Sequence, residues 1–99
     1  MNRYSIAPRA KADLDEIWNY LGIQKDAPAA AHRQVEMLFD KFSLLAAHPL
    51  LGEARSDLGA DLRSFVAGNY VVVYRVGSGE IEIARVMHAA RDIRSLFGS

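Results

Sequence analysis

The residues with the clearest chemical potential are His88, Arg91 and Asp92, which lie in the segment RVMHAARDI, residues 85–93. This segment reads as the end of a β-strand and its exit. A histidine can transfer a proton near neutral pH, and the planar guanidinium of an arginine can bind a phosphate or a carboxylate. The segment therefore fits an active site, an anion-binding corner or a solvated strand end. Asp92 weakens the catalytic interpretation, because its carboxylate can neutralise the neighbouring Arg91.

Several arginines come from the predicted late strands and from the exit of the last strand, namely Arg63, Arg75, Arg85 and Arg91. Pairing in one sheet can bring some of them together, and grouped guanidinium groups suit carboxylate or phosphate recognition. The alternative is ordinary salt bridging to nearby acidic residues. The available partners are Asp61, Glu80, Glu82 and Asp92. The sequence leaves both interpretations open.

No metal or cofactor is expected. The chain has no cysteine, and His32, His48 and His88 are far apart in the sequence, without partners at helical ligand spacing. We also find no motif for phosphate cradling or for a nucleophile elbow.

Two other groups of residues have both a functional and a structural interpretation. Asp13, Asp15 and Glu16 could act as catalytic carboxylates, but we interpret them as the solvated face of the first helix. A set of apolar residues at helical spacing could line a ligand pocket, but we interpret it as a core stripe. Its members are Trp18, Leu38, Phe39 and Phe42.

The first half of the chain predicts a short strand followed by a helical hairpin. Residues 3–7 alternate like a strand. A helical stripe then begins at Pro8, which suits the first position of a helix, and we expect Gly22 to end it. Asp26 and Pro28 predict the cap and first turn of a second helix, which the His48–Pro49 step stops.

The second half predicts a small sheet. Residues 50–61 read as a loop, and three strand candidates follow, joined by hairpin-turn sequences. The middle candidate is apolar on both faces, so we expect the hairpin to cover one face and the tail or a partner to cover the other. The strand candidates span 62–66, 70–76 and 80–88, and residues 91–97 read as a short helix or an extended tail.

This order, β-α-α-β-β-β, predicts an α+β fold in which the helical hairpin packs on a small antiparallel sheet. A chain of 99 residues forms one domain, residues 1–99. The formal net charge of zero argues against broad nucleic-acid binding, which favours a basic protein. No signal peptide or membrane span is recognisable, so we expect a cytoplasmic protein.

The chain resembles the ParE branch of the ParE/RelE toxin superfamily, the toxins of type II toxin–antitoxin pairs. PRAKADLDEIWNYL is similar to the first helix of that family, and LAAHPLLGEAR to the end of its second helix with the following loop. LRSFVAGNYVVVYRV and IEIARVMHAARDI are similar to its sheet, in which the last strand ends in His-x-x-Arg-Asp. The resemblance covers nearly the whole chain and implies the same β-α-α-β-β-β fold.

The superfamily implies two alternative activities. RelE-like members cleave messenger RNA on the ribosome, using basic residues on the sheet, an arginine near the end of the last strand and often a tyrosine in the tail. Here the corresponding positions carry Leu62, Ser64, Val71 and Phe97, and only Arg91 matches, with His88 as a candidate base. ParE-like members mostly inhibit DNA gyrase, which needs a binding surface rather than a catalytic set. The resemblance therefore favours gyrase inhibition without catalytic residues, with a ribosome-dependent mRNA endoribonuclease using His88 and Arg91 as the alternative.

The resemblance also implies a ParD-like antitoxin, whose C-terminal segment folds as it wraps the toxin. The candidate antitoxin contacts are Trp18, Tyr20, Leu21 and Arg75. The candidate contacts with the target are Arg63, Arg75, His88 and Arg91. A third hypothesis is a member without toxicity, whose antitoxin complex only represses its own operon.

Overall fold

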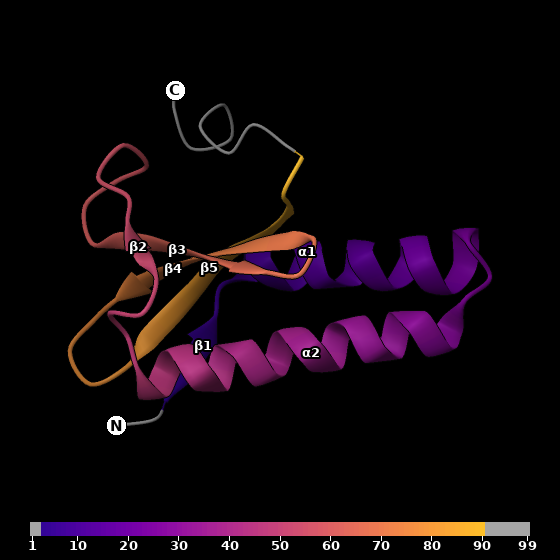
Figure 1. The fold of residues 1–99 in the computed structure, drawn as a ribbon, viewed down its shortest axis with the longest axis horizontal. Helices are drawn as coiled ribbons and strands as arrows, with labels where there is room; N and C mark the ends of the chain where they lie inside the picture. The colour runs from indigo at the N-terminus through magenta and orange to yellow at the C-terminus, as the bar shows by residue number, and fades with distance from the viewer. Residues whose placement is uncertain (1–2, 91–99) are drawn as a thin grey trace.

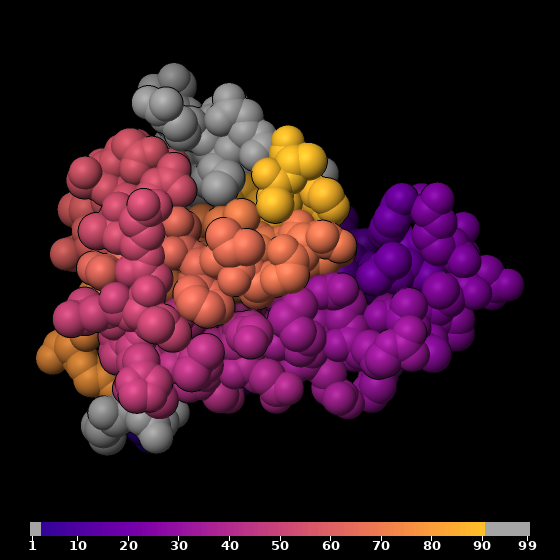
Figure 2. All heavy atoms as spheres, viewed as in Figure 1, coloured from indigo at the N-terminus to yellow at the C-terminus, as the bar shows by residue number. Residues whose placement is uncertain are grey.

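The computed structural model of the protein describes residues 3–90. A hairpin of two helices lies against a five-stranded sheet, and the far end of the hairpin projects past the sheet (Figure 1 and Figure 2). The predicted α+β class, with a helical hairpin on a small sheet, is confirmed. Arg91, Asp92 and the helix or tail predicted for residues 91–97 lie outside the described residues.

The hairpin consists of α1 (Pro8–Asn19) and α2 (Pro28–Ala47), with the π-helical segment η1 (Tyr20–Gln24) continuing α1. Both helices carry proline in their first turn, as predicted. No helix within residues 3–90 is long and apolar enough to cross a membrane.

Two predictions about the hairpin turn were wrong. Gly22 does not end the first helix, because one glycine weakens a helix by about 1 kcal/mol without breaking its hydrogen bonding. The helical path instead runs on to Gln24. Asp26 does not cap α2, which has no side-chain cap. Its backbone turns the chain with a φ of 51°, a left-handed conformation that a short polar side chain tolerates.

The sheet is mixed rather than purely antiparallel. Its order is β1-β5-β4-β3-β2, and β1 pairs with β5 in parallel, whereas the other pairings are antiparallel. β2 lies within the segment predicted to be a loop, and it was missed because two residues cannot show an alternating pattern. The strands are β1 (Tyr4–Ile6), β2 (Glu53–Ala54), β3 (Leu62–Ala67), β4 (Tyr70–Val76) and β5 (Ile81–His88).

Both faces of the sheet are apolar and covered, as the pattern of the middle strand predicted. Val72 and Tyr74 of β4 belong to the main core together with residues of the helical hairpin. Val71 and Val73 belong to a second cluster on the opposite face, which also contains Leu58. The cover of this second face therefore includes the chain's own 50–61 segment, which the sequence had not suggested.

Candidate functional site

A groove lies between the helical hairpin and one end of the sheet. It is an open-sided hollow of about 400 Å³, a volume at the lower end of the range for ligand pockets, roughly 300–1,000 Å³. We call it the sheet-end groove. It is lined by Asp13, Glu16, Ile17, Tyr20, Leu21, Gln34, Asn69, Tyr70, Val86, Met87 and His88. The groove brings the target candidate His88 together with the antitoxin candidates Tyr20 and Leu21.

His88 ends β5 and lies beside Tyr70, its partner across the β4–β5 ladder. The two rings meet edge to face, with centroids 5.5 Å apart. Nδ1 of His88 accepts a hydrogen bond of 3.2 Å from the backbone N–H of Ala90. A neutral imidazole with an accepting Nδ1 carries its proton on Nε2. His88 therefore presents a donor, rather than a free base, at its other nitrogen.

Tyrosines form part of the groove wall. Burial raises the pKa of the Tyr70 phenol above its usual value near 10, and the neighbouring Tyr20 adds to the rise. Tyr70 therefore stays neutral under physiological conditions. Tyr20 and Leu21 belong to the π-helical segment η1, and such segments often occur at functional sites.

Asp13 lines the groove but is buried, so its interpretation as a solvated residue was wrong. Its carboxylate accepts two hydrogen bonds from Arg85, from Nε at 2.8 Å and from an Nη atom at 3.0 Å. It also accepts the backbone N–H of Val86 at 2.9 Å. β1 pairs with β5 only as far as Ile83. Farther along the same edge of β5, the Asp13 carboxylate accepts the backbone N–H that a neighbouring strand would otherwise accept.

The Asp13–Arg85 pair is buried, with both residues less than a tenth exposed. The hydrogen bond to Asp13 is the main factor that raises the pKa of Arg85 above its ordinary value, against the opposing effect of burial. Its partner is Asp13, which was not among the acidic partners predicted for the arginines; of those, Asp92 lies outside the described residues. Asp15 and Glu16, by contrast, are exposed as predicted.

Arg63 and Arg75 lie at the opposite end of the sheet from His88. Arg75 pairs with Leu62 and Glu82, whereas Tyr70 pairs with His88. The separation along β4 is five residues, or about 16 Å. Arg63 and Arg75 therefore do not share a site with His88.

Arg63 and Arg75 bind backbone carbonyl groups rather than the predicted carboxylates. Arg63 donates to the carbonyl oxygens of Gly52 and Leu50, at 2.8 Å and 3.3 Å. Arg75 donates to that of Ala60 at 3.0 Å. These bonds fix the 50–61 segment to the sheet.

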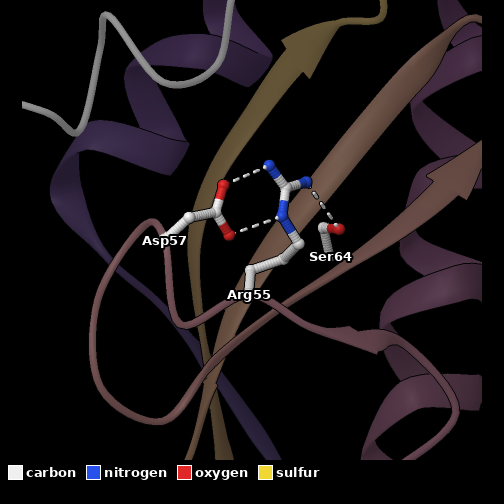
Figure 3. A network of polar contacts seen from close by, with 3 residues as sticks. All are labelled: Arg55, Asp57 and Ser64. Carbon is white, nitrogen blue, oxygen red and sulfur yellow. Dashed lines mark hydrogen bonds and ion pairs between the residues drawn. The ribbon is translucent and has the colours of Figure 1, made fainter.

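A further arginine in the same segment, Arg55, was not singled out from the sequence. It forms two hydrogen bonds with the carboxylate of Asp57, at 3.0 Å and 2.9 Å, and one with the Ser64 hydroxyl at 3.2 Å (Figure 3). The hydrogen bond to Asp57 is the main factor that raises the pKa of Arg55. We interpret this network as structural, because every arm of the guanidinium is occupied within the protein.

A second groove is lined by residues of α1, α2 and β1, and we call it the outer groove. It has a volume of about 440 Å³. Trp18 and Phe39 lie in it and are 40% and 37% exposed, so the prediction that both belong to a core stripe was wrong. Leu38 and Phe42 are fully buried, as that prediction required. The outer groove is lined by Ile6, Lys11, Leu14, Asp15, Trp18, Val35 and Phe39.

Within residues 3–90, no group of three or more histidine, cysteine, aspartate or glutamate side chains is placed to hold a metal ion. The two grooves described above differ in character: the outer groove is mostly apolar, and the sheet-end groove combines aromatic rings with carboxylates.

Comparison with known proteins identifies the family. A family model described as "ParE toxin of type II toxin-antitoxin system, parDE" matches residues 4–93. The chain belongs to the ParE toxin family. The resemblance inferred from the sequence motifs is therefore confirmed.

Two relatives and one solved structure illustrate the similarity of this ParE-family chain to known toxins. Toxin ParE1 of Caulobacter vibrioides is 36% identical, over 99% of this chain and 100% of that protein. Toxin RelE3 of the same organism is 34% identical, over 90% of this chain and 96% of that protein. A solved structure titled "Chromosomal ParDE TA system from P. aeruginosa" has a TM-score of 0.72 at 23% identity, covering 89% of this chain and 96% of that chain. This last match shows a shared fold.

In this ParE-family toxin, the described positions that the sequence resemblance set against the sheet cations of the ribonucleases are buried. Leu62, Ser64 and Val71 are 4%, 9% and 7% exposed, and Leu62 and Val71 belong to the second apolar cluster. Phe97 and Arg91, the other positions of that comparison, lie outside the described residues.

Proposed function

We propose that this ParE-type toxin acts in the cytoplasm by inhibiting DNA gyrase and is neutralised by a ParD-like antitoxin. The observation that carries the proposal is the burial of Leu62, Ser64 and Val71. Stabilising the phosphorane of RNA cleavage requires cations aimed at the reacting phosphate. The apolar cluster that contains Leu62 and Val71 cannot supply them, and the Arg55 guanidinium beside Ser64 is already held by Asp57. The hydrogen bond at Nδ1 of His88 also argues against a free general base.

The outer groove supports the proposed antitoxin partner. Exposed apolar side chains gathered in one hollow mark an interaction site, and an amphipathic helix that folds on binding is a typical occupant of such a groove. Trp18 is the antitoxin candidate that lies in this groove. The solved structure that shares the fold is titled a ParDE system, which supports an antitoxin as the partner. Tyr20, Leu21 and Arg75, the other antitoxin contacts predicted from the sequence, do not line the outer groove.

Induced expression of the chain tests the proposed target. We expect growth arrest, DNA breaks and loss of gyrase supercoiling activity, with intact transcripts. His88→Ala and Arg91→Ala variants should each lose less than about tenfold in toxicity, since a nuclease that used these residues would lose orders of magnitude. Cleaved transcripts that depend on Arg91 would establish the ribonuclease alternative, and unaffected growth would support a member without toxicity.

Replacing Trp18 with alanine tests the antitoxin surface. We expect the dissociation constant for the cognate antitoxin, measured by calorimetry, to rise about thirtyfold or more, as for a central aromatic contact. Ile23→Ala is the matched control, because Ile23 is also exposed and apolar but does not line the outer groove. Equal effects of the two substitutions would place the antitoxin elsewhere.

A further inference from the structure

Among the contacts of residues 3–90, one negative charge in the sheet-end groove is not neutralised. Asp13 and Arg85 satisfy each other through two hydrogen bonds. Glu16 lies one helical turn after Asp13, lines the same groove and is exposed. Within residues 3–90, it has no ion-pair or hydrogen-bond partner, although its charge helps to raise the pKa of Arg85. Two carboxylates and one guanidinium leave one negative charge, and no lysine or arginine of the described chain lines the groove.

The groove also presents aromatic rings beside this charge. Tyr20, Tyr70 and His88 all line it, and the faces of tyrosine rings attract cations. The Nζ atom of Lys25 lies 5.5 Å from the centroid of the Tyr20 ring, so this ring already attracts a cation within the protein. A carboxylate combined with tyrosine rings favours a guanidinium or an ammonium group.

We propose that the sheet-end groove receives an arginine or lysine side chain of the target protein. Glu16 is its ion-pair partner, and Tyr20 and Tyr70 form the walls. This inference rests on the proposed function and names the chemistry of the target contact. It commits to the target rather than to the antitoxin because of charge complementarity: the outer groove offers mainly apolar surface to a folding helix, whereas this groove offers a carboxylate without a partner among the described residues. Tyr20 and Leu21, which the sequence suggested as antitoxin contacts, are thereby reassigned to the target. An incoming cation would exclude water from Glu16, which strengthens the attraction between the two charges.

Neutralising Glu16 tests the proposal. In Glu16→Gln, we expect the toxin concentration that half-inhibits purified DNA gyrase in a supercoiling assay to rise at least about tenfold. The affinity for the cognate antitoxin should change less than about twofold. Asp40→Asn is the matched control, because Asp40 is an exposed carboxylate of α2 that does not line the groove, and it should leave both measurements unchanged. The inhibition by the wild type should also weaken with salt more steeply than that by Glu16→Gln.

A small-molecule probe tests the groove without reference to gyrase. N-acetyl-arginine amide should shift the NMR signals of Tyr20, Tyr70 and His88 in the wild type. These shifts should be much smaller in Glu16→Gln, or with the neutral citrulline analogue.

The outcomes separate this inference from the proposed function. If the wild-type toxin leaves gyrase active, the proposed target is wrong. The NMR probe alone then tests whether the groove binds a cation. Equal responses to the arginine and citrulline probes would overturn the cation site. A Glu16→Gln variant that loses antitoxin affinity but still inhibits gyrase would assign the groove to the antitoxin and overturn its assignment to the target.

Discussion

Replacing Asp13 with alanine is expected to lower the free energy of unfolding by about 3 kcal/mol, because it removes one partner of a buried ion pair. Arg85 would keep its charge in a buried position without the two hydrogen bonds that now satisfy it. The backbone N–H of Val86 would also lose its acceptor, which adds the cost of an unsatisfied buried donor. Urea denaturation followed by circular dichroism measures the effect as a lower midpoint.

Asp15→Ala is the matched control for this prediction, because Asp15 lies on the same helix and is exposed. It should change the stability by less than about 0.5 kcal/mol. The double variant Asp13→Leu, Arg85→Leu should recover part of the loss, since an apolar pair can replace a buried ion pair at little cost, whereas the Val86 N–H still lacks its acceptor. Equal midpoints for Asp13→Ala and Asp15→Ala would show that the pair contributes no net stability.

The elements with strong periodicity could be predicted from the sequence because their local pattern agrees with their tertiary environment. The alternation in β4 correctly separated Val72 and Tyr74 from Val71 and Val73, and these pairs lie in two different clusters. The step before Pro49 ended α2 as predicted, since His48 has an extended φ of −133°. In these cases, short-range sterics and the hydrophobic period decide the structure.

The Asp13–Arg85 pair shows where prediction from the sequence failed. The two residues are 72 positions apart, so no local pattern links them. One signal was nevertheless present: Ala10, Asp13, Leu14 and Ile17 follow the i, i+3, i+4, i+7 spacing of a buried helix face, and all four are buried. Asp13 was grouped with Asp15 and Glu16 by charge, whereas its position on the helix predicted burial.

The candidate site could be predicted only in part. A helix turns by about 100° per residue, so residues that are close in the sequence can face different surfaces. Trp18 and Tyr20 are near neighbours in the sequence, but they line two different grooves. The meeting of Tyr20 with His88 depends on the packing of the hairpin against the sheet. The sequence indicated these residues as candidate contacts without showing which of them act together.

Replacing Gly52 with alanine is expected to lower the free energy of unfolding by about 2–3 kcal/mol, because the added methyl group has no space. A Cβ atom at this position would lie 2.5 Å from the hydroxyl oxygen of Tyr74 and 2.8 Å from the backbone oxygen of Ser64. The Tyr74 hydroxyl now donates to the carbonyl of Pro49 at 2.7 Å and accepts the N–H of Gly52 at 2.9 Å. Relieving the clash moves the chain away from the fully buried Tyr74 and weakens both bonds. Thermal and urea denaturation should both show the loss.

Gly22→Ala is the matched control, since its added Cβ would meet Ala31 at an ordinary contact distance of 3.6 Å. Alanine is also favoured over glycine in a helix by up to about 1 kcal/mol, so this variant should be unchanged or slightly more stable. Tyr74→Phe removes the hydroxyl oxygen that the new methyl group would strike. Combined with Gly52→Ala, it should therefore cost less than the sum of the two single substitutions, as expected for residues in contact. Additive losses would mean that the Tyr74 hydroxyl is not what excludes a side chain at position 52.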